Sequence, residues 1–199
     1  MQRQASILAA LALLAAALAP AAHAARVHVR VEGRTRTLFG ATEPQLNAST
    51  SALDALEAAS VGGEFYYHVS QTGFGPYVDQ IGRFRGVGTS GWVFKVNGES
   101  PPVGADQTRL KDGDRVLWYW ASFGEAAGGP PTLRLVRDRR GCYRVLAEDD
   151  RGARAAAVGA VLSVDGRRIR TRAARACLGP HRGLVRATRS GSVRSNAVR

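Results

Sequence analysis

The chain has 199 residues, a formal net charge of +12, 23 glycines and only two cysteines. This length fits one or two small domains and excludes a large cofactor-binding α/β enzyme. Hydrophobic residues make up 45% of the sequence, but much of that share is alanine, and a large part lies in the first 24 residues.

An export signal is predicted over residues 1–24. Arg3 precedes an apolar run from Ile7 to Leu18, and Ala22-His23-Ala24 has the small-residue pattern of a cleavage site. The apolar run is shorter than the roughly 20 residues that span a bilayer. We therefore expect an exported protein, extracellular or associated with the cell surface, with no transmembrane helix.

Charge divides the rest of the chain into two parts. Residues 25–122 hold ten basic and ten acidic residues, whereas residues 123–199 hold seventeen arginines and six acidic residues. The arginines are scattered, with no nucleic-acid-binding motif around them, which argues against specific nucleic-acid binding. Two explanations remain for the excess of arginine in residues 123–199: a general attraction to an anionic surface, or a codon bias that favours arginine.

A linker over residues 123–131 separates two predicted domains. Gly124 to Pro131 is rich in glycine and ends in a proline pair, a composition that continues neither a helix nor a strand. The domains that follow from this boundary are residues 25–122 and residues 132–199.

The first domain begins with a half-buried strand over residues 26–32, in which Val27, Val29 and Val31 share one face. Ser51 is a predicted cap for a short helix over residues 52–59, which Gly62-Gly63 ends. Further strands are expected over residues 65–69, 77–81, 92–96 and 115–120. This pattern predicts an α+β domain with one helix laid across a mixed sheet.

The second domain is predicted to be all-β. Alternating apolar and arginine positions recur with turn signals such as Asp165-Gly166, which indicates an antiparallel β-sandwich. The expected strands are residues 132–136, 142–146, 158–164, 168–170, 183–188 and 195–198. Cys142 and Cys177 both lie in this domain, and in an exported chain they favour a disulfide over two buried free thiols.

Four blocks of the first domain carry a resemblance to a known family. They are TSALDAL (50–56), GPYVDQIG (75–82), GWVFKVNG (91–98) and GADQTRLKDGDRVLWYW (104–120). In this order they resemble the transcobalamin-like C-terminal domain family, over residues 27–120. The resemblance implies a β-grasp-like, non-catalytic module that binds a ligand or adheres to a surface. It also implies cobalamin as a ligand, because the family is related to the smaller domain of the vitamin B12 carriers. In those carriers a larger helical domain completes the site, and this chain has no room for such a domain.

A second resemblance concerns residues 156–171 and 183–198. These stretches are similar to small immunoglobulin-like repeats of bacterial surface proteins. The resemblance implies that the second domain is a spacer or display domain.

Catalytic, metal-binding and cofactor-binding residues are not expected. His28, His68 and His181 lack the spacing of a zinc helix, and the surroundings of Ser90 lack the second glycine of a nucleophile elbow. Asp112 and Asp114, together with Asp106, could hold a hard cation. In a D-G-D sequence, however, the aspartate side chains more commonly accept hydrogen bonds from the backbone of the turn itself.

Aromatic residues are the most informative candidates for binding. Trp118 and Trp120 should share one face of a strand, and Tyr119 the other, so one of the two faces is left for solvent or for the second domain. The exposed contact positions that we select are Trp92, Tyr119 and Trp120, with Tyr77 and Asn97 as weaker neighbours.

The sequence as a whole predicts an exported, non-catalytic binding or adhesive module for a small molecule, a glycan or an envelope polymer. A purely structural envelope protein that only contacts other proteins is the alternative. A hydrolase would require Ser90, a histidine and an acid to converge in one pocket.

Overall fold

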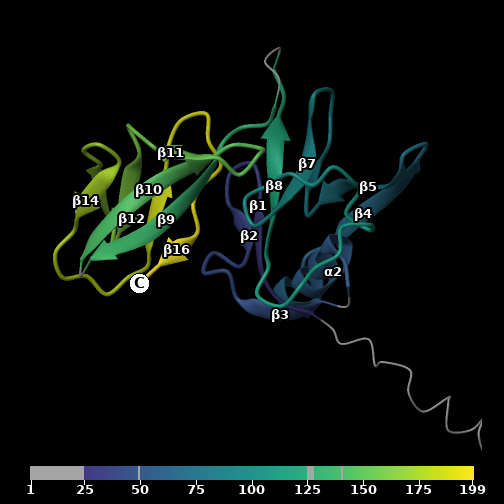
Figure 1. Ribbon diagram of the computed structural model, residues 1–199, viewed down its shortest axis with the longest axis horizontal. Coiled ribbons are helices and arrows are strands. Elements are labelled where there is room, and N and C mark those ends of the chain that lie inside the picture. The colour runs from purple at the N-terminus through teal and green to yellow at the C-terminus, as the bar shows by residue number, and fades with distance from the viewer. Residues whose placement is uncertain (1–24, 49, 125–127, 140) are drawn as a thin grey trace, which may run out of the picture.

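The computed structural model describes residues 25–48, 50–124, 128–139 and 141–199 (Figure 1). The predicted signal peptide, residues 1–24, lies outside the described residues. Below, residues 25–122 are called the N-terminal region and residues 132–199 the C-terminal region. The first contains helix α2 and a mixed sheet, and the second is built of strands. The predicted order of an α+β part followed by an all-β part is therefore confirmed.

The N-terminal region is organised around strand β1. Its elements are β1 (Ala25–Glu32), β2 (Thr37–Phe39), β3 (Gln45–Ala48), α2 (Ala52–Gly63), β4 (Tyr67–Thr72), β5 (Gly75–Ile81), β6 (Phe84–Arg85), β7 (Ser90–Val96) and β8 (Arg115–Ser122). β1 pairs in parallel with β8 and antiparallel with β2 and β3, and β7 pairs antiparallel with β8. This confirms the mixed sheet. β4, β5 and β6 form a separate antiparallel sheet.

Helix α2 starts as predicted and ends later than predicted. The Ser51 hydroxyl accepts from the Asp54 amide, and the Asp54 carboxylate accepts from the Ser51 amide at 2.8 Å, which is a complete capping box. The helix ends at Gly63, so the glycine pair forms its last turn rather than following an end at residue 59. A Cβ on Gly63 would lie 2.7 Å from the ring of Phe39, so the glycine gives that ring the space to pack on the helix.

Strand β8 has different neighbours on its two faces. Val116, Trp118 and Trp120 belong to the core that contains α2, as the predicted alternation requires. Tyr119 lies on the opposite face, in a small cluster with Val193 of the C-terminal region. The second face of the strand is therefore packed against the C-terminal region rather than left to solvent.

Strand β1 is buried on both faces, which corrects the prediction of a half-buried strand. Val27, Val29 and Val31 point into the N-terminal core, but Arg30 and Glu32 are also buried. Glu32 pairs with Arg186 and Arg194, and Arg30 donates to the Arg194 carbonyl. These partners lie far along the chain, so no alternation of polar and apolar residues could reveal this burial.

The C-terminal region is a two-sheet sandwich. Its elements are β9 (Thr132–Arg139), β10 (Cys142–Glu148), β11 (Arg154–Ala156), β12 (Val161–Val164), β13 (Arg167–Arg170), β14 (Arg175–Cys177), β15 (Val185–Thr188) and β16 (Ala197–Val198). One antiparallel sheet has the order β11-β10-β14, with β9 also paired to β10, and the other has the order β13-β12-β15-β16. Side chains of both sheets, such as Tyr143 and Leu162, share one core. The antiparallel architecture agrees with the prediction, whereas the immunoglobulin-like assignment stays a prediction.

A disulfide joins Cys142 of β10 to Cys177 of β14, as predicted. The two cysteines are register partners in adjacent antiparallel strands. Along the described residues, none of the helices has the length and hydropathy of a membrane span.

Candidate functional site

An apolar groove runs along β7, the strand at one end of the mixed sheet. Its volume is about 330 Å³, and residues of β5, of the loop after β7 and of both regions of the chain contribute to it. We call it the β7 groove. Its lining residues are Pro76, Tyr77, Val78, Trp92, Val93, Phe94, Ser100, Pro101, Gly104, Ala105, Trp118, Tyr119, Phe123 and Asp150.

Tyr77 forms one wall of the groove by crossing from β5 to β7. A Cβ on Gly91 would lie 2.6 Å from the Tyr77 hydroxyl oxygen, so the glycine allows this approach. Tyr77 remains 43% exposed, although Gly91 and Trp92, which its hydroxyl contacts, are buried. Tyr77 therefore offers an accessible ring whose position is fixed at its hydroxyl end.

A carboxylate from the C-terminal region completes the groove. Asp150 accepts from the Gly129 amide at 2.7 Å and pairs with Lys95 Nζ at 3.2 Å. Burial alone would raise the pKa of this carboxyl, but the Gly129 amide and then Lys95 outweigh it, so the pKa lies below its usual value. At neutral pH Asp150 is therefore an ionised hydrogen-bond acceptor at the groove.

Lys95 supports this carboxylate from a fully buried position. Its Nζ also donates to the carbonyl oxygens of Asp149 at 2.7 Å and Glu148 at 3.3 Å, and it lies 5.9 Å from the centre of the Tyr119 ring. A buried amine is tolerated only when it has such partners. Through these contacts Lys95 of β7 holds residues 148–150 of the C-terminal region in place, so the position of Asp150 in the groove is fixed.

Both tyrosines of the groove keep their protons at neutral pH. Burial raises the pKa of Tyr77, the backbone of Trp92 opposes that shift, and the charge of Asp79 adds to it. Burial also raises the pKa of Tyr119, and the charge of Asp150 acts in the same direction. These phenols remain neutral O–H groups that can donate or accept a hydrogen bond.

The structure brings three of the predicted contact residues together in the groove: Tyr77, Trp92 and Tyr119. The expectation that Trp92 and Tyr119 are exposed is wrong, because each is only 1% exposed. The Trp92 ring packs edge-on against Trp120 and its Nε1 donates to the Phe84 carbonyl at 2.8 Å, while the C-terminal region covers Tyr119. Their part in binding a ligand stays a prediction.

Trp120 and Asn97 do not line the groove. Trp120 is half-buried between Trp92 and Phe84. Asn97 is exposed at the turn after β7, where its side chain donates to Asp114 at 2.8 Å and accepts from the Arg115 amide at 3.0 Å. Its polar atoms hold the local backbone, which explains why an asparagine stands at this turn.

Two residues that the sequence interpretation did not select, Phe123 and Asp150, also line the groove. Phe123 is 37% exposed. It directly follows the aromatic strand β8, and that position in the sequence was a usable signal. Asp150 belongs to the other region, and no spacing in the sequence links it to β7.

The other chemically interesting side chains have structural partners. The Ser90 hydroxyl bonds that of Ser122 at 2.8 Å. His28 bonds the Glu43 carbonyl, His68 bonds Asp79, and His181 bonds the Tyr143 hydroxyl. None of these contacts joins Ser90 to a histidine.

The two aspartates of the D-G-D turn hold backbone groups. Asp112 accepts from the Arg26 amide and Asp114 from the Lys111 amide, each at 2.8 Å. Within the residues that the structure describes, no group of three or more His, Cys, Asp or Glu residues could hold a metal ion.

Comparison with known proteins gives a match to part of the chain. The model of a family described as "Domain of unknown function (DUF4430)" matches residues 49–122, which include α2, β7 and β8. No curated protein matches the chain. The resemblance to the transcobalamin-like family stays a prediction.

A solved structure is similar to half of the chain. It is described as a "putative metal binding protein" from Ruminococcus gnavus, and it is 16% identical, with a TM-score of 0.39. The match covers 50% of this chain and 99% of that one. A likeness of this strength carries no argument about function.

Proposed function

We propose that the protein is an exported, non-catalytic binding module whose β7 groove takes one sugar ring of an envelope glycan. The observation that carries this proposal is the groove itself, with aromatic and aliphatic walls and a fixed carboxylate. Small-molecule sites combine mostly apolar walls with a few well-placed polar groups. A sugar ring has an apolar face for such walls and hydroxyl donors for a carboxylate.

The size of the groove favours a single ring. About 330 Å³ is near the lower end of the range for small-molecule sites, roughly 300–1,000 Å³. A corrinoid, which the family resemblance implies, would extend well beyond it. The sugar is therefore our choice, and a corrinoid is the competing ligand in the experiment below.

The contacts of the potentially catalytic groups support a non-catalytic role. Ser90 is bonded to another serine, and the three histidines of the described chain are bonded to other groups. Nucleophilic catalysis requires a base within hydrogen-bond reach of the nucleophile. The disulfide agrees with export, because disulfides persist in oxidising compartments.

Titration of the full chain with an N-acetylglucosamine oligomer tests the proposal. Trp92 and Trp118 line the groove, so binding should change tryptophan fluorescence in a saturable way, and calorimetry should give the same affinity. Tyr77→Ala removes the accessible wall and should weaken binding about tenfold, as loss of an aromatic contact of about 1.4 kcal/mol would.

Tyr66→Ala is the matched control, because Tyr66 is 60% exposed and does not line the groove. It should leave the affinity unchanged. Equal weakening by both variants would reject the groove as the site. If the protein bound cyanocobalamin but not the sugar, and Tyr77→Ala weakened that binding, the β7 groove would still be the site but the glycan would be rejected as its ligand.

A further inference from the structure

Strand β14 lies at the end of the C-terminal region that points away from the N-terminal region (Figure 1). The surface around this strand is strongly basic. Two hollows of about 560 and 490 Å³ lie there, and both are lined by Cys177. We call this surface the basic tip and define it by the arginines that line the two hollows, Arg137, Arg139, Arg170, Arg172, Arg175 and Arg199.

The positive charge of the basic tip is barely neutralised. Asp138 is the one acidic residue that lines either hollow, and it lies 3.8 Å from Arg175, which is 58% exposed. Within the described chain no other arginine of the tip has an ion pair, and all of them are exposed. An anion that binds there would relieve the repulsion among these charges.

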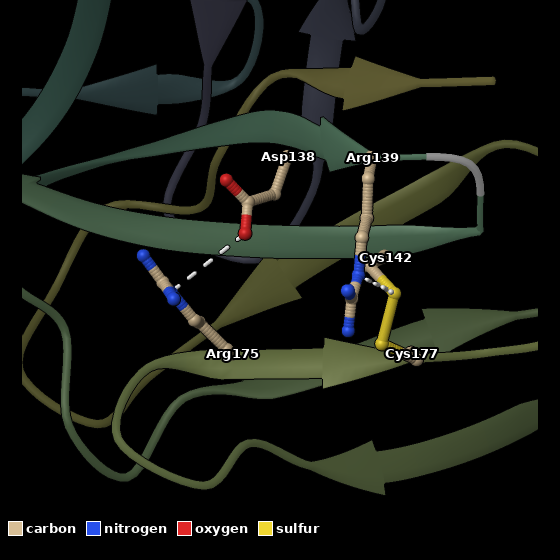
Figure 2. Close-up of a disulfide and its surroundings, with 5 residues drawn as sticks. All are labelled: Asp138, Arg139, Cys142, Arg175 and Cys177. Carbon is tan, nitrogen blue, oxygen red and sulfur yellow. Dashed lines mark hydrogen bonds and ion pairs between the residues drawn. A yellow bond between two sulfur atoms is a disulfide. The ribbon is translucent and has the colours of Figure 1, made fainter.

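The disulfide holds part of this charge in place. Figure 2 shows Asp138 and Arg139 on β9 and Arg175 on β14, the strand that the Cys142–Cys177 bond joins to β10. Arg139 Nε lies 3.4 Å from Cys142 Sγ. The crosslink ties β14, which carries Arg175, to β10, which pairs with β9, so Arg137 and Arg139 of β9 and Arg175 of β14 keep a fixed spacing. This is a built surface rather than a mobile charged tail.

The side chains of the tip select among anionic partners. Guanidinium groups match phosphate oxygens in bidentate geometry, and several in a row suit several phosphates. Two rings line the hollows: Tyr143 is fully buried, and His181 is half-buried with its nitrogens bonded to the Tyr143 hydroxyl and the Gly183 carbonyl. The lining therefore offers no fully exposed aromatic ring of the kind on which nucleobases stack. The exposed large hydrophobic residues also lie outside these hollows, so an insertion into a bilayer has no apolar anchor here.

We propose that the basic tip binds consecutive phosphate groups of a linear, base-free phosphate chain. This site is separate from the β7 groove and uses other residues, so it would give the protein a second attachment point. The proposal assigns a binding role to one defined part of the positive charge of residues 123–199, the six arginines of the basic tip.

The test is binding of long-chain inorganic polyphosphate to the full chain with its disulfide intact, measured at two salt concentrations. Binding should weaken steeply with salt, and orthophosphate should bind far more weakly than the chain. Replacing two tip arginines, as Arg170→Gln with Arg172→Gln, should weaken binding about tenfold at moderate salt and lower the salt slope by about two.

The matched control is Arg34→Gln with Arg36→Gln. It removes the same charge at the same spacing from an exposed turn of the N-terminal region and should leave binding unchanged. Arg139→Gln with Arg199→Gln is a second tip pair that should repeat the loss, if the first pair disturbs β13. Circular dichroism checks the fold of each variant.

Three results would overturn the proposal. Equal loss in the control pair would show that only net charge matters. Tighter binding of single-stranded DNA than of polyphosphate at equal charge would assign the surface to nucleic acid. Binding of phosphatidylglycerol vesicles without polyphosphate binding would assign it to a membrane.

Discussion

Gly62 and Gly63 are chemically identical neighbours at the end of α2, but their surroundings differ. A Cβ on Gly62 would lie 3.5 Å from Phe39, an ordinary contact, whereas one on Gly63 would lie 2.7 Å from Phe39 and 3.0 Å from Phe65. The first glycine only costs helix stability, while the second makes room for two rings that cover the helix.

The two glycines should therefore respond oppositely to alanine. Gly62→Ala should stabilise the protein by about 0.5–1 kcal/mol, the usual gain of alanine over glycine in a helix. Gly63→Ala should destabilise it by about 1–3 kcal/mol, because the rings must move. Urea unfolding of both variants measures this, and a Gly63→Ala protein as stable as Gly62→Ala would contradict our account.

At the scale of elements, the start of α2 depends on an ionised carboxylate. Burial alone would raise the pKa of Asp54, but hydrogen bonds from the Thr50 and Ser51 amides outweigh it and lower the pKa below 3.8. The folded protein then binds this proton less readily than the unfolded chain does. The carboxylate therefore adds stability above about pH 4, and that stability is lost as the pH falls through the lowered pKa.

Asp54→Asn should lower the free energy of unfolding by about 1 kcal/mol at pH 7, as loss of a capping contact does. Protonation removes the same interaction from the unchanged protein, so the difference between the two proteins should shrink as the pH falls through the lowered pKa of Asp54. Urea titrations at pH 7 and pH 2.5 give the two differences. A constant difference would mean that the ionised form of Asp54 has no special role.

The predicted elements were most accurate where a local signal was strong. The capping box located the start of α2, and alternation located β1, β7 and β8. Strands β2, β3, β6, β11 and β14 were not predicted, because runs of two to four residues are too short to show a period. They exist because longer neighbours offer them hydrogen bonds.

At the scale of the whole molecule, a buried ion cluster joins the two regions. Glu32 of β1 is 1% exposed and pairs with Arg30 of the same strand and with Arg186 and Arg194 of the C-terminal region. Arg30 in turn donates to the Arg194 carbonyl at 2.7 Å. The contacts of Lys95 and Tyr119 with the C-terminal region act beside this cluster.

Removing the central carboxylate should therefore uncouple the regions. Glu32→Ala leaves the part-buried Arg186 and Arg194 without a carboxylate and the buried Arg30 with only Glu43, and should destabilise the protein by about 3–5 kcal/mol. In calorimetry we expect the two regions to unfold at separate temperatures in the variant. Arg85→Ala, which breaks an exposed pair with Asp79, should change stability by less than about 1 kcal/mol. A single unshifted transition in Glu32→Ala would reject the coupling.

Local patterns in the sequence by themselves determined the classes of the two regions, the capping box, the disulfide pair and the aromatic strands, because each depends on residues that are close together or on simple counting. Tertiary structure decided which faces are covered. Arg30 and Glu32 are buried, and Trp92 and Tyr119 lie under other residues, because segments up to about 160 residues away pack on them. The β7 groove likewise needs Asp150, which only the packing of the two regions brings to the edge of the sheet.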